Sequence, residues 1–283
     1  MSGAARGAWR DAWRRLLGQR SHRWALFALA ALVAGAVLVP LASPHGYATP
    51  EWTRILRAPS FSAPFGTDGL GRDLLVRSMW GCRVSLLVGL VASVLSVIIG
   101  VTWGATAGLL GGRWDSLMMR IVDVLYSVPF IPLVIVLTVV FGRHFLLVFA
   151  AIGAVSWLDI ARIVRGQALA IGQREYIEAA RALGLPAHRL LWRHYVPNLA
   201  GIVVVYATLT VPSVILFEAL LSFLGLGVQA PLASLGSLVA DGAAEMQAHP
   251  HVLIFPAVLL ALLILCLNHL GDGLRDALDP RQR

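Results

Sequence analysis

Long apolar segments recur along the chain and are separated by shorter polar stretches. A helix rises 1.5 Å per residue, so about 20 apolar residues cross the roughly 30 Å of hydrocarbon in a bilayer. Segments of this length predict six transmembrane helices, over residues 24–41, 84–106, 118–141, 145–164, 202–224 and 251–270. The sequence therefore predicts an all-α integral membrane protein, with a first helix within residues 24–43 and a five-helix core over residues 84–272.

Glycines and prolines inside these segments predict how the helices pack. Gly100, Gly104 and Gly108 repeat at every fourth residue, a spacing of small residues that lets transmembrane helices approach closely. A helix end that is simply rich in glycine is the alternative interpretation. Pro129 and Pro132 should kink the third span, because proline removes a hydrogen-bond donor and its ring clashes with the preceding turn.

Composition agrees with the membrane assignment, because 58% of the 283 residues are hydrophobic and only 13% are charged. Such values exclude a soluble enzyme domain. All 23 basic residues are arginine, so the chain cannot contain a phosphate-binding loop, which requires lysine. We expect no catalytic residue, no bound cofactor and no bound metal. Cys82 and Cys266 lie in or beside apolar segments and are expected to be small buried hydrophobic residues.

Arginines flank the apolar segments, which is typical of membrane orientation and argues against a nucleic-acid partner. Residues 1–23 contain one acid, Asp11, and six arginines: Arg6, Arg10, Arg14, Arg15, Arg20 and Arg23. We expect this tail to be cytoplasmic, and six crossings return residues 273–283 to the same side. The proline-rich connection over residues 44–83 should lie outside and contain a short interfacial helix. A cleaved signal peptide is the competing interpretation of the first apolar segment, but no clear cleavage site is present.

A polar loop over residues 165–198 interrupts the apolar segments. Its residues 176, 179, 180 and 183 have helical spacing and predict one small, mostly apolar helix face. Gly184 is expected to end this helix with a positive φ, and Pro186 to start a second helix that Pro197 and Asn198 end. From the pattern alone, the pair of helices could also lie on anionic lipid.

The residues of this loop closely resemble the EAA loop of importer-type ABC transporter permeases. The matching residues are Glu178, Ala179, Ala180, Gly184, Pro197 and Asn198. Arg181 lies between them and is included in the expected coupling loop. In that family the loop is a cytoplasmic coupling helix that sits in a groove of an ATPase subunit. The resemblance therefore implies that the loop contacts a protein partner and not lipid alone.

A second signature precedes the second predicted span. Residues 66–73 include Gly66, Thr67, Asp68, Gly71, Arg72 and Asp73. From the pattern alone, Thr67 or Asp68 could cap a short helix. The segment also resembles a signature of the second permease subunit of peptide and nickel importers, and residues 82–86 (Cys-Arg-Val-Ser-Leu) resemble a further run of that subfamily. Nearly the whole chain is similar to this subfamily, and most similar to the second, or C-type, membrane subunit of oligopeptide permeases.

The resemblance implies a type I ABC importer permease fold in the bacterial inner membrane. It also implies four kinds of partner: a second homologous permease, two ABC ATPase subunits that bind ATP and Mg²⁺, an extracytoplasmic peptide-binding protein and membrane lipid. The expected function is import of oligopeptides or dipeptides. A nickel or other small-solute importer of the same subfamily is the alternative, and a proton-coupled carrier is an alternative from another class.

The residues that line the pathway are less constrained by the sequence. Glu218 is the carboxylate most enclosed by apolar sequence, so it is either a cavity or gate group or a buried group satisfied by neighbouring hydroxyls. Tyr206 and Ser213 in the same span are further pathway candidates. Residues 241, 245, 249 and 251 (Asp, Glu, His and His) could be drawn as a metal site, but loop histidines are usually solvated.

Overall fold

The computed structural model describes residues 14–44, 46–142 and 145–278, with the side chains of residues 145–151 left out. The expected tails, 1–23 and 273–283, therefore lie partly outside the described residues. Within those ranges the protein is nearly all helical and has no strand beyond two isolated bridges. The elements are α2 (Arg20–Ala42), η1 (Trp52–Arg54), α3 (Leu74–Leu110), α4 (Gly112–Ser127), α5 (Phe130–Phe141), α6 (Phe145–Gly172), α7 (Glu175–Ala182), α8 (Ala187–Leu190), the π-helical turn η2 (Leu191–Tyr195), α9 (Val196–Phe223), α10 (Leu235–Glu245) and α11 (His251–Leu278).

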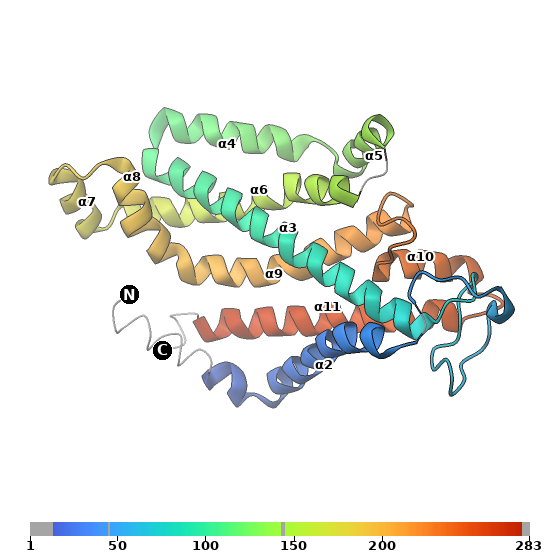
Figure 1. The fold of residues 1–283 in the computed structure, drawn as a ribbon. Coiled ribbons are helices and arrows are strands. Elements are labelled where there is room, and N and C mark those ends of the chain that lie inside the picture. The colour runs from blue at the N-terminus through green and yellow to red at the C-terminus, as the bar shows by residue number, and fades with distance from the viewer. Residues whose placement is uncertain (1–13, 45, 143–144, 279–283) are drawn as a thin grey trace.

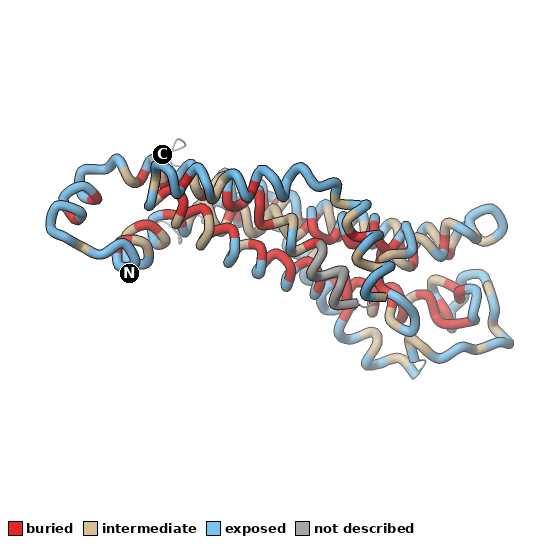
Figure 2. The backbone as a smooth tube through the Cα atoms, turned by 90° about the horizontal axis from the view of Figure 1, so that it is seen from above, coloured by how far each residue is buried: buried red, intermediate tan, exposed pale blue. Residues whose placement is uncertain are grey.

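The long helices run side by side in an elongated bundle (Figure 1). The start of α2, the end of α11 and the short helices α7 and α8 lie at one end, and α10 and the 44–73 connection lie at the other. Buried residues follow the inner sides of the helices, whereas exposed residues cover the outside (Figure 2). Helix α3 crosses the bundle and packs against α6, α9 and α2.

Four continuous helical segments in the described part are long and apolar enough to span a membrane, and the bent pair of α4 and α5 would make five. The prediction of six adds α6, which has 28 residues and is therefore long enough by rise alone. The six-helix count fits the structure.

The predicted glycine packing is confirmed at the contact between α3 and α6. A Cβ atom on Gly104 would lie only 2.3 Å from the carbonyl oxygen of Ala161. Equivalent atoms on Gly100 and Gly108 would lie 2.7 Å from Ile160 Cβ and 2.6 Å from Ala168 Cβ. The absence of side chains on three successive turns of α3 thus lets the two backbones approach closely.

The third predicted span breaks where a kink was expected. Helix α4 ends at Ser127, α5 begins at Phe130, and the two helices are bent by 78°. Val128, which precedes Pro129, has extended backbone dihedral angles, and a residue before proline is biased away from helical conformation. The effect of the proline is therefore a break and not a bend within one helix.

Several predicted boundaries were wrong. The short interfacial helix expected before residue 84 is the first part of α3, which begins at Leu74 and has 37 residues. Its cap is Asp73, not Thr67 or Asp68, because the Asp73 carboxylate accepts from the backbone N–H groups of Leu75 and Val76. Helix α11 continues to Leu278, so the first residues of the expected tail at 273–283 are helical. Helix α10 was not predicted.

Candidate coupling loop and transmembrane cavity

Helix α7 presents two different faces. Ile177 is fully buried and Ala180 is 8% exposed, whereas Tyr176 is 42% and Leu183 is 81% exposed. Ile177 belongs to a hydrophobic cluster that also contains Ile171 at the end of α6. Ala180 therefore faces the bundle, which corrects the predicted face that grouped it with Tyr176 and Leu183. Glu178 and Ala179 are exposed and are available to a partner.

The bend after α7 is built as expected from its glycine. Gly184 has a φ of +75°, the left-handed region that favours glycine. Its N–H donates to the carbonyl of Arg181, and the N–H of Leu185 donates to the carbonyl of Ala180. This pair of bonds is the Schellman arrangement that satisfies the last carbonyls of a helix. The predicted positive φ is confirmed.

Arg181 joins α7 to the turn that follows α8. Its Nη2 donates to the hydroxyl of Tyr195 at 3.0 Å, and Tyr195 is fully buried. The same hydroxyl packs against Gly172 at the end of α6, where an added Cβ would lie 2.9 Å away. The sequence did not single out Tyr195, because nothing local distinguishes it from other aromatic residues near a membrane boundary.

The second coupling helix does not end at Pro197 and Asn198, so that prediction was wrong. Helix α8, η2 and α9 form one continuous helical segment from Ala187 to Phe223. The π-helical turn η2 widens the helix just before Pro197, and Asn198 Nδ2 donates to the carbonyl of His194 at 2.6 Å. An inserted residue accommodates the proline ring, which would otherwise clash with the preceding turn. The coupling loop therefore leads directly into α9.

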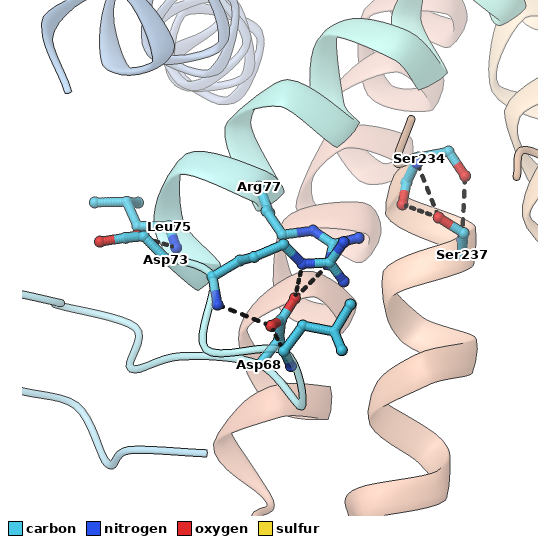
Figure 3. A network of polar contacts seen from close by, with 8 residues as sticks. Asp68, Asp73, Leu75, Arg77, Ser234 and Ser237 are labelled. Atoms are coloured by element: carbon cyan, nitrogen blue, oxygen red, sulfur yellow. Dashed lines mark hydrogen bonds and ion pairs between the residues drawn. The ribbon is translucent and has the colours of Figure 1, made fainter. Parts of the chain in front are cut away.

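The second signature forms a buried charge cluster at the opposite end of the bundle (Figure 3). Asp68 is 5% exposed and accepts from the backbone N–H groups of Leu70 and Arg72. It also accepts from the side chains of Arg72 and Arg77, which are 8% and 2% exposed. One carboxylate thus forms ion pairs with two buried guanidinium groups.

The other signature residues hold the outer connection against the start of α3. Thr67 accepts from the N–H of Arg57 at 2.9 Å and donates to the carbonyl of Arg54. Gly66 and Gly71 have φ values of +77° and +76°. A Cβ atom on Gly71 would lie 1.9 Å from the carbonyl oxygen of Glu51, so no other residue fits at this contact.

The run at residues 82–86 connects α3 to three other elements, α2, α9 and α10. Pro40 in α2 has no N–H to donate to the Ala36 carbonyl one turn earlier, and Arg83 Nε supplies that donor at 3.1 Å. Ser85 Oγ donates to Glu218 at 3.1 Å and accepts from the N–H of Leu235 at the start of α10. Each polar residue of the run therefore makes a contact between elements.

Glu218 is buried within a group of serines. It is fully buried and accepts from Ser85 at 3.1 Å and from Ser222 at 2.7 Å. Ser222 also lies 3.3 Å from Ser234, which caps α10. Of the two interpretations left open by the sequence, this arrangement favours a buried group satisfied by hydroxyls.

An outer pocket of about 610 Å³ lies between the charge cluster and α10. Its lining includes Asp241 and Glu245, and partial burial raises the pKa of the Asp241 carboxyl, an effect that nearby Arg72 opposes. His251, another of the four residues considered as a metal site, packs against Gly66. Among the described residues, no group of three His, Cys, Asp or Glu side chains is placed to hold a metal ion.

A cavity of about 590 Å³ opens between α4, α5, α6 and α9. Tyr206 and Ser213 line it, as do Tyr126, Ser156, Asp159 and Thr210, whereas Glu218 does not. Most of the other lining residues are apolar, among them Phe130 and Phe217. The structure thus brings two of the three pathway candidates together and adds Asp159, which was not among them.

Comparison with known families accounts for most of the chain. The family described as the inner membrane component of binding-protein-dependent transport systems matches residues 100–283. The chain belongs to this family. A second family, the N-terminal transmembrane domain of oligopeptide transport permease C, matches residues 7–63. This binding-protein-dependent permease is a multi-pass inner membrane protein, and its family comprises transport components and not hydrolases.

Relatives of this permease extend over nearly its whole length. The oligopeptide transport system permease protein OppC of Haemophilus influenzae is 47% identical over 98% of this chain and 90% of that protein. The OppC protein of Escherichia coli K12 is 48% identical over 98% of this chain and 93% of that protein. The dipeptide transport system permease protein DppC of Bacillus subtilis is 43% identical over 96% of this chain and 86% of that protein.

The fold of the permease is that of a type I ABC importer. A chain of the MetNI methionine ABC transporter in an inward-facing conformation superposes with a TM-score of 0.57 at 21% identity. The match covers 71% of this permease and 96% of that chain. The predicted fold class and family are confirmed, and membership implies that the permease works with an ATPase and a substrate-binding protein.

Proposed function

We propose that this permease is a membrane subunit of an ATP-driven importer that moves oligopeptides across the inner membrane. The observation that carries the proposal is its identity of 47–48% to two OppC proteins over 98% of its length. Similarity of this extent includes the outer connection and the coupling loop as well as the apolar helices. The chain provides the pathway, and it needs no cofactor of its own.

The importer contains a second homologous permease, two ABC ATPase subunits that bind ATP and Mg²⁺, and an external peptide-binding protein. The exposed side of α7, with Tyr176, Ala179 and Leu183, provides an unpartnered surface for an ATPase subunit. Charge supports a cytoplasmic position for this surface, because residues 162–198 contain six arginines and two glutamates. The start of α2 and the end of α11 lie at the same end of the bundle as α7 (Figure 1), which supports a cytoplasmic position for these two helix ends as well.

Two physical connections link α7 to the cavity. Arg181 and Tyr195 hold α7 against η2 and the end of α6. The continuous helical segment from α8 through α9 then reaches Tyr206 and Ser213 in the cavity wall. When the ATPase subunits bind ATP and close, α7 would therefore move α9 as a rigid body. This movement would switch the cavity between inward and outward access.

The alternatives have less support. A nickel importer would be expected to offer soft or imidazole ligands along its pathway, but the described residues that line the cavity include no histidine or cysteine. The hypothesis of a proton-coupled carrier requires Glu218 as a proton-relay group. That carboxylate accepts hydrogen bonds from serine hydroxyls and does not line the cavity.

Uptake of a labelled peptide tests the proposed function. In cells that express the complete importer, removal of this chain alone should reduce uptake of a labelled tripeptide to background, because the pathway is lost. Uptake of the free labelled amino acid is the control and should not change. Full peptide uptake without the chain, or loss of nickel uptake in place of peptide uptake, would contradict the proposal.

A further inference from the structure

The cavity contains a carboxylate about halfway along a membrane-spanning helix. Asp159 lies near the middle of α6, because α6 continues to Gly172 and does not end near residue 164 as the sequence predicted. Its side chain is exposed and contributes to the cavity lining. An ionisable group on the wall of a cavity between membrane helices is usually retained for a function.

The neighbouring charges leave Asp159 without an opposite charge. Arg162 is the nearest arginine on α6, but its Nη2 pairs with Asp123 at 2.8 Å. The guanidinium of Arg162 also stacks on Tyr126, 4.4 Å from the ring centroid. Asp159 receives only a neutral hydrogen bond, from the Tyr126 hydroxyl at 3.0 Å. Within the described chain, one positive and two negative groups at this place leave one negative charge on the cavity wall.

Three further hydroxyls of the cavity, apart from that of Tyr206, are oriented as hydrogen-bond acceptors. Ser156, Thr210 and Ser213 each donate their hydroxyl proton to a carbonyl of their own helix, at 2.8, 2.6 and 3.2 Å. Their lone pairs remain available to a ligand that donates hydrogen bonds. The other walls are largely apolar and aromatic, so they impose little selection on side-chain type.

These features fit the one positive group that all unmodified peptides share. An N-terminal ammonium donates three hydrogen bonds and carries the positive charge that Asp159 lacks as a partner within the described chain. The attraction between the two groups is strengthened in a cavity of low dielectric constant. We propose that Asp159 receives the N-terminal ammonium of the peptide during its passage. The inference rests on the proposed function and names the group of the substrate that the cavity recognises. A volume of about 590 Å³ accommodates the first few residues and leaves the rest of the peptide outside.

A single reporter cysteine tests the charge of the cavity. Ser156 lies one turn before Asp159 and lines the same cavity. The chain's two native cysteines are buried, so Ser156→Cys adds an accessible thiol to this subunit. In the purified complete importer without the binding protein or nucleotide, a positively charged methanethiosulfonate should label this thiol about tenfold faster than a negatively charged one, a difference set by local charge. Asp159→Asn should remove most of that difference.

Protection by peptide tests the ammonium contact itself. Trialanine and its C-terminal amide should slow labelling several-fold, whereas N-acetyl-trialanine should not. Asp159→Asn keeps an acceptor for Tyr126 and removes the charge, so it should abolish the advantage of the free amino group. Tyr126→Phe removes the hydrogen bond and keeps the charge, so the advantage should persist.

Several outcomes would overturn the inference. The first is equal labelling of the thiol by reagents of opposite charge, as a cation from the neighbouring permease would produce. The second is equal protection of the thiol by free and acetylated peptides, or no protection by either. The third is protection by the free amino group that persists in Asp159→Asn. ATP-driven peptide uptake by the same wild-type complex is measured in parallel. Uptake together with any of these outcomes rejects the role of Asp159 alone, whereas absence of uptake rejects the proposed function.

Discussion

Asp68→Ala is expected to cause the largest loss of stability of any single substitution in the outer region. Asp68 is the shared partner of Arg72 and Arg77, and all three side chains are at most 8% exposed. Removal of one member of a buried ion pair costs about 3–5 kcal/mol, because the remaining charges stay buried without a partner. We expect a low level of the chain in membranes and a lower melting temperature in detergent.

Two controls separate the buried charge from ordinary surface effects. Asp68→Asn keeps a hydrogen-bond acceptor and should lose less stability than Asp68→Ala. Glu51→Ala removes the partner of a more exposed pair with Arg54, and such pairs contribute about 0–1 kcal/mol. If Asp68→Ala reached wild-type levels with an unchanged melting temperature, the cluster would not stabilise the fold.

Gly184→Val is expected to cause the largest loss of coupling. Gly184 has a φ of +75°, and an added Cβ would meet no atom within 4 Å. The cost is therefore backbone strain of about 1–2 kcal/mol and not a steric clash within the chain. If the bend must form to dock the ATPase, this strain weakens docking by about 5- to 30-fold. Co-purification of the ATPase and peptide uptake should both fall, while insertion in the membrane continues because no span changes.

Gly225→Val is a matched control at the opposite end of α9. Gly225 has a φ of +74°, has no atom within 4 Å of an added Cβ, and ends its helix with the same pair of backbone hydrogen bonds as Gly184. It should suffer similar strain without losing the ATPase. Glu178→Ala should affect structure little, because alanine is a good helix former, so any loss of uptake would come from a missing contact. Normal uptake by Gly184→Val at normal membrane levels would make the bend dispensable.

The features that the sequence predicted correctly depend on local chemistry. Gly184 follows a short helical pattern and precedes Pro186, a combination that determines a helix end with few alternatives. Gly100, Gly104 and Gly108 have the spacing of a helix contact, and the contact with α6 is present. Both predictions needed only the preferences of the residues themselves.

The features that the sequence missed depend on tertiary structure. Pro197 normally ends a helix, but the π-helical turn before it allows the helix to continue. Helix α10 is short and rich in glycine and alanine, so its pattern is weak, although Ser234 and Ser237 cap its start reciprocally. The cavity is lined by Asp159 and not by Glu218, and the sequence could not predict this, because the packing of neighbouring helices determines which side of a helix faces a cavity.

Crosslinking from α7 tests the central claim that this permease contacts an ATPase through its coupling loop. Leu183 is 81% exposed, and both native cysteines are buried, so Leu183→Cys gives an accessible thiol at the proposed contact. A bismaleimide applied to membranes that contain the complete importer should join this thiol to the ATPase, whereas Phe61→Cys in the outer connection should give no such product. An ATPase product from Phe61→Cys, or none from Leu183→Cys when that thiol is otherwise labelled, would contradict the account.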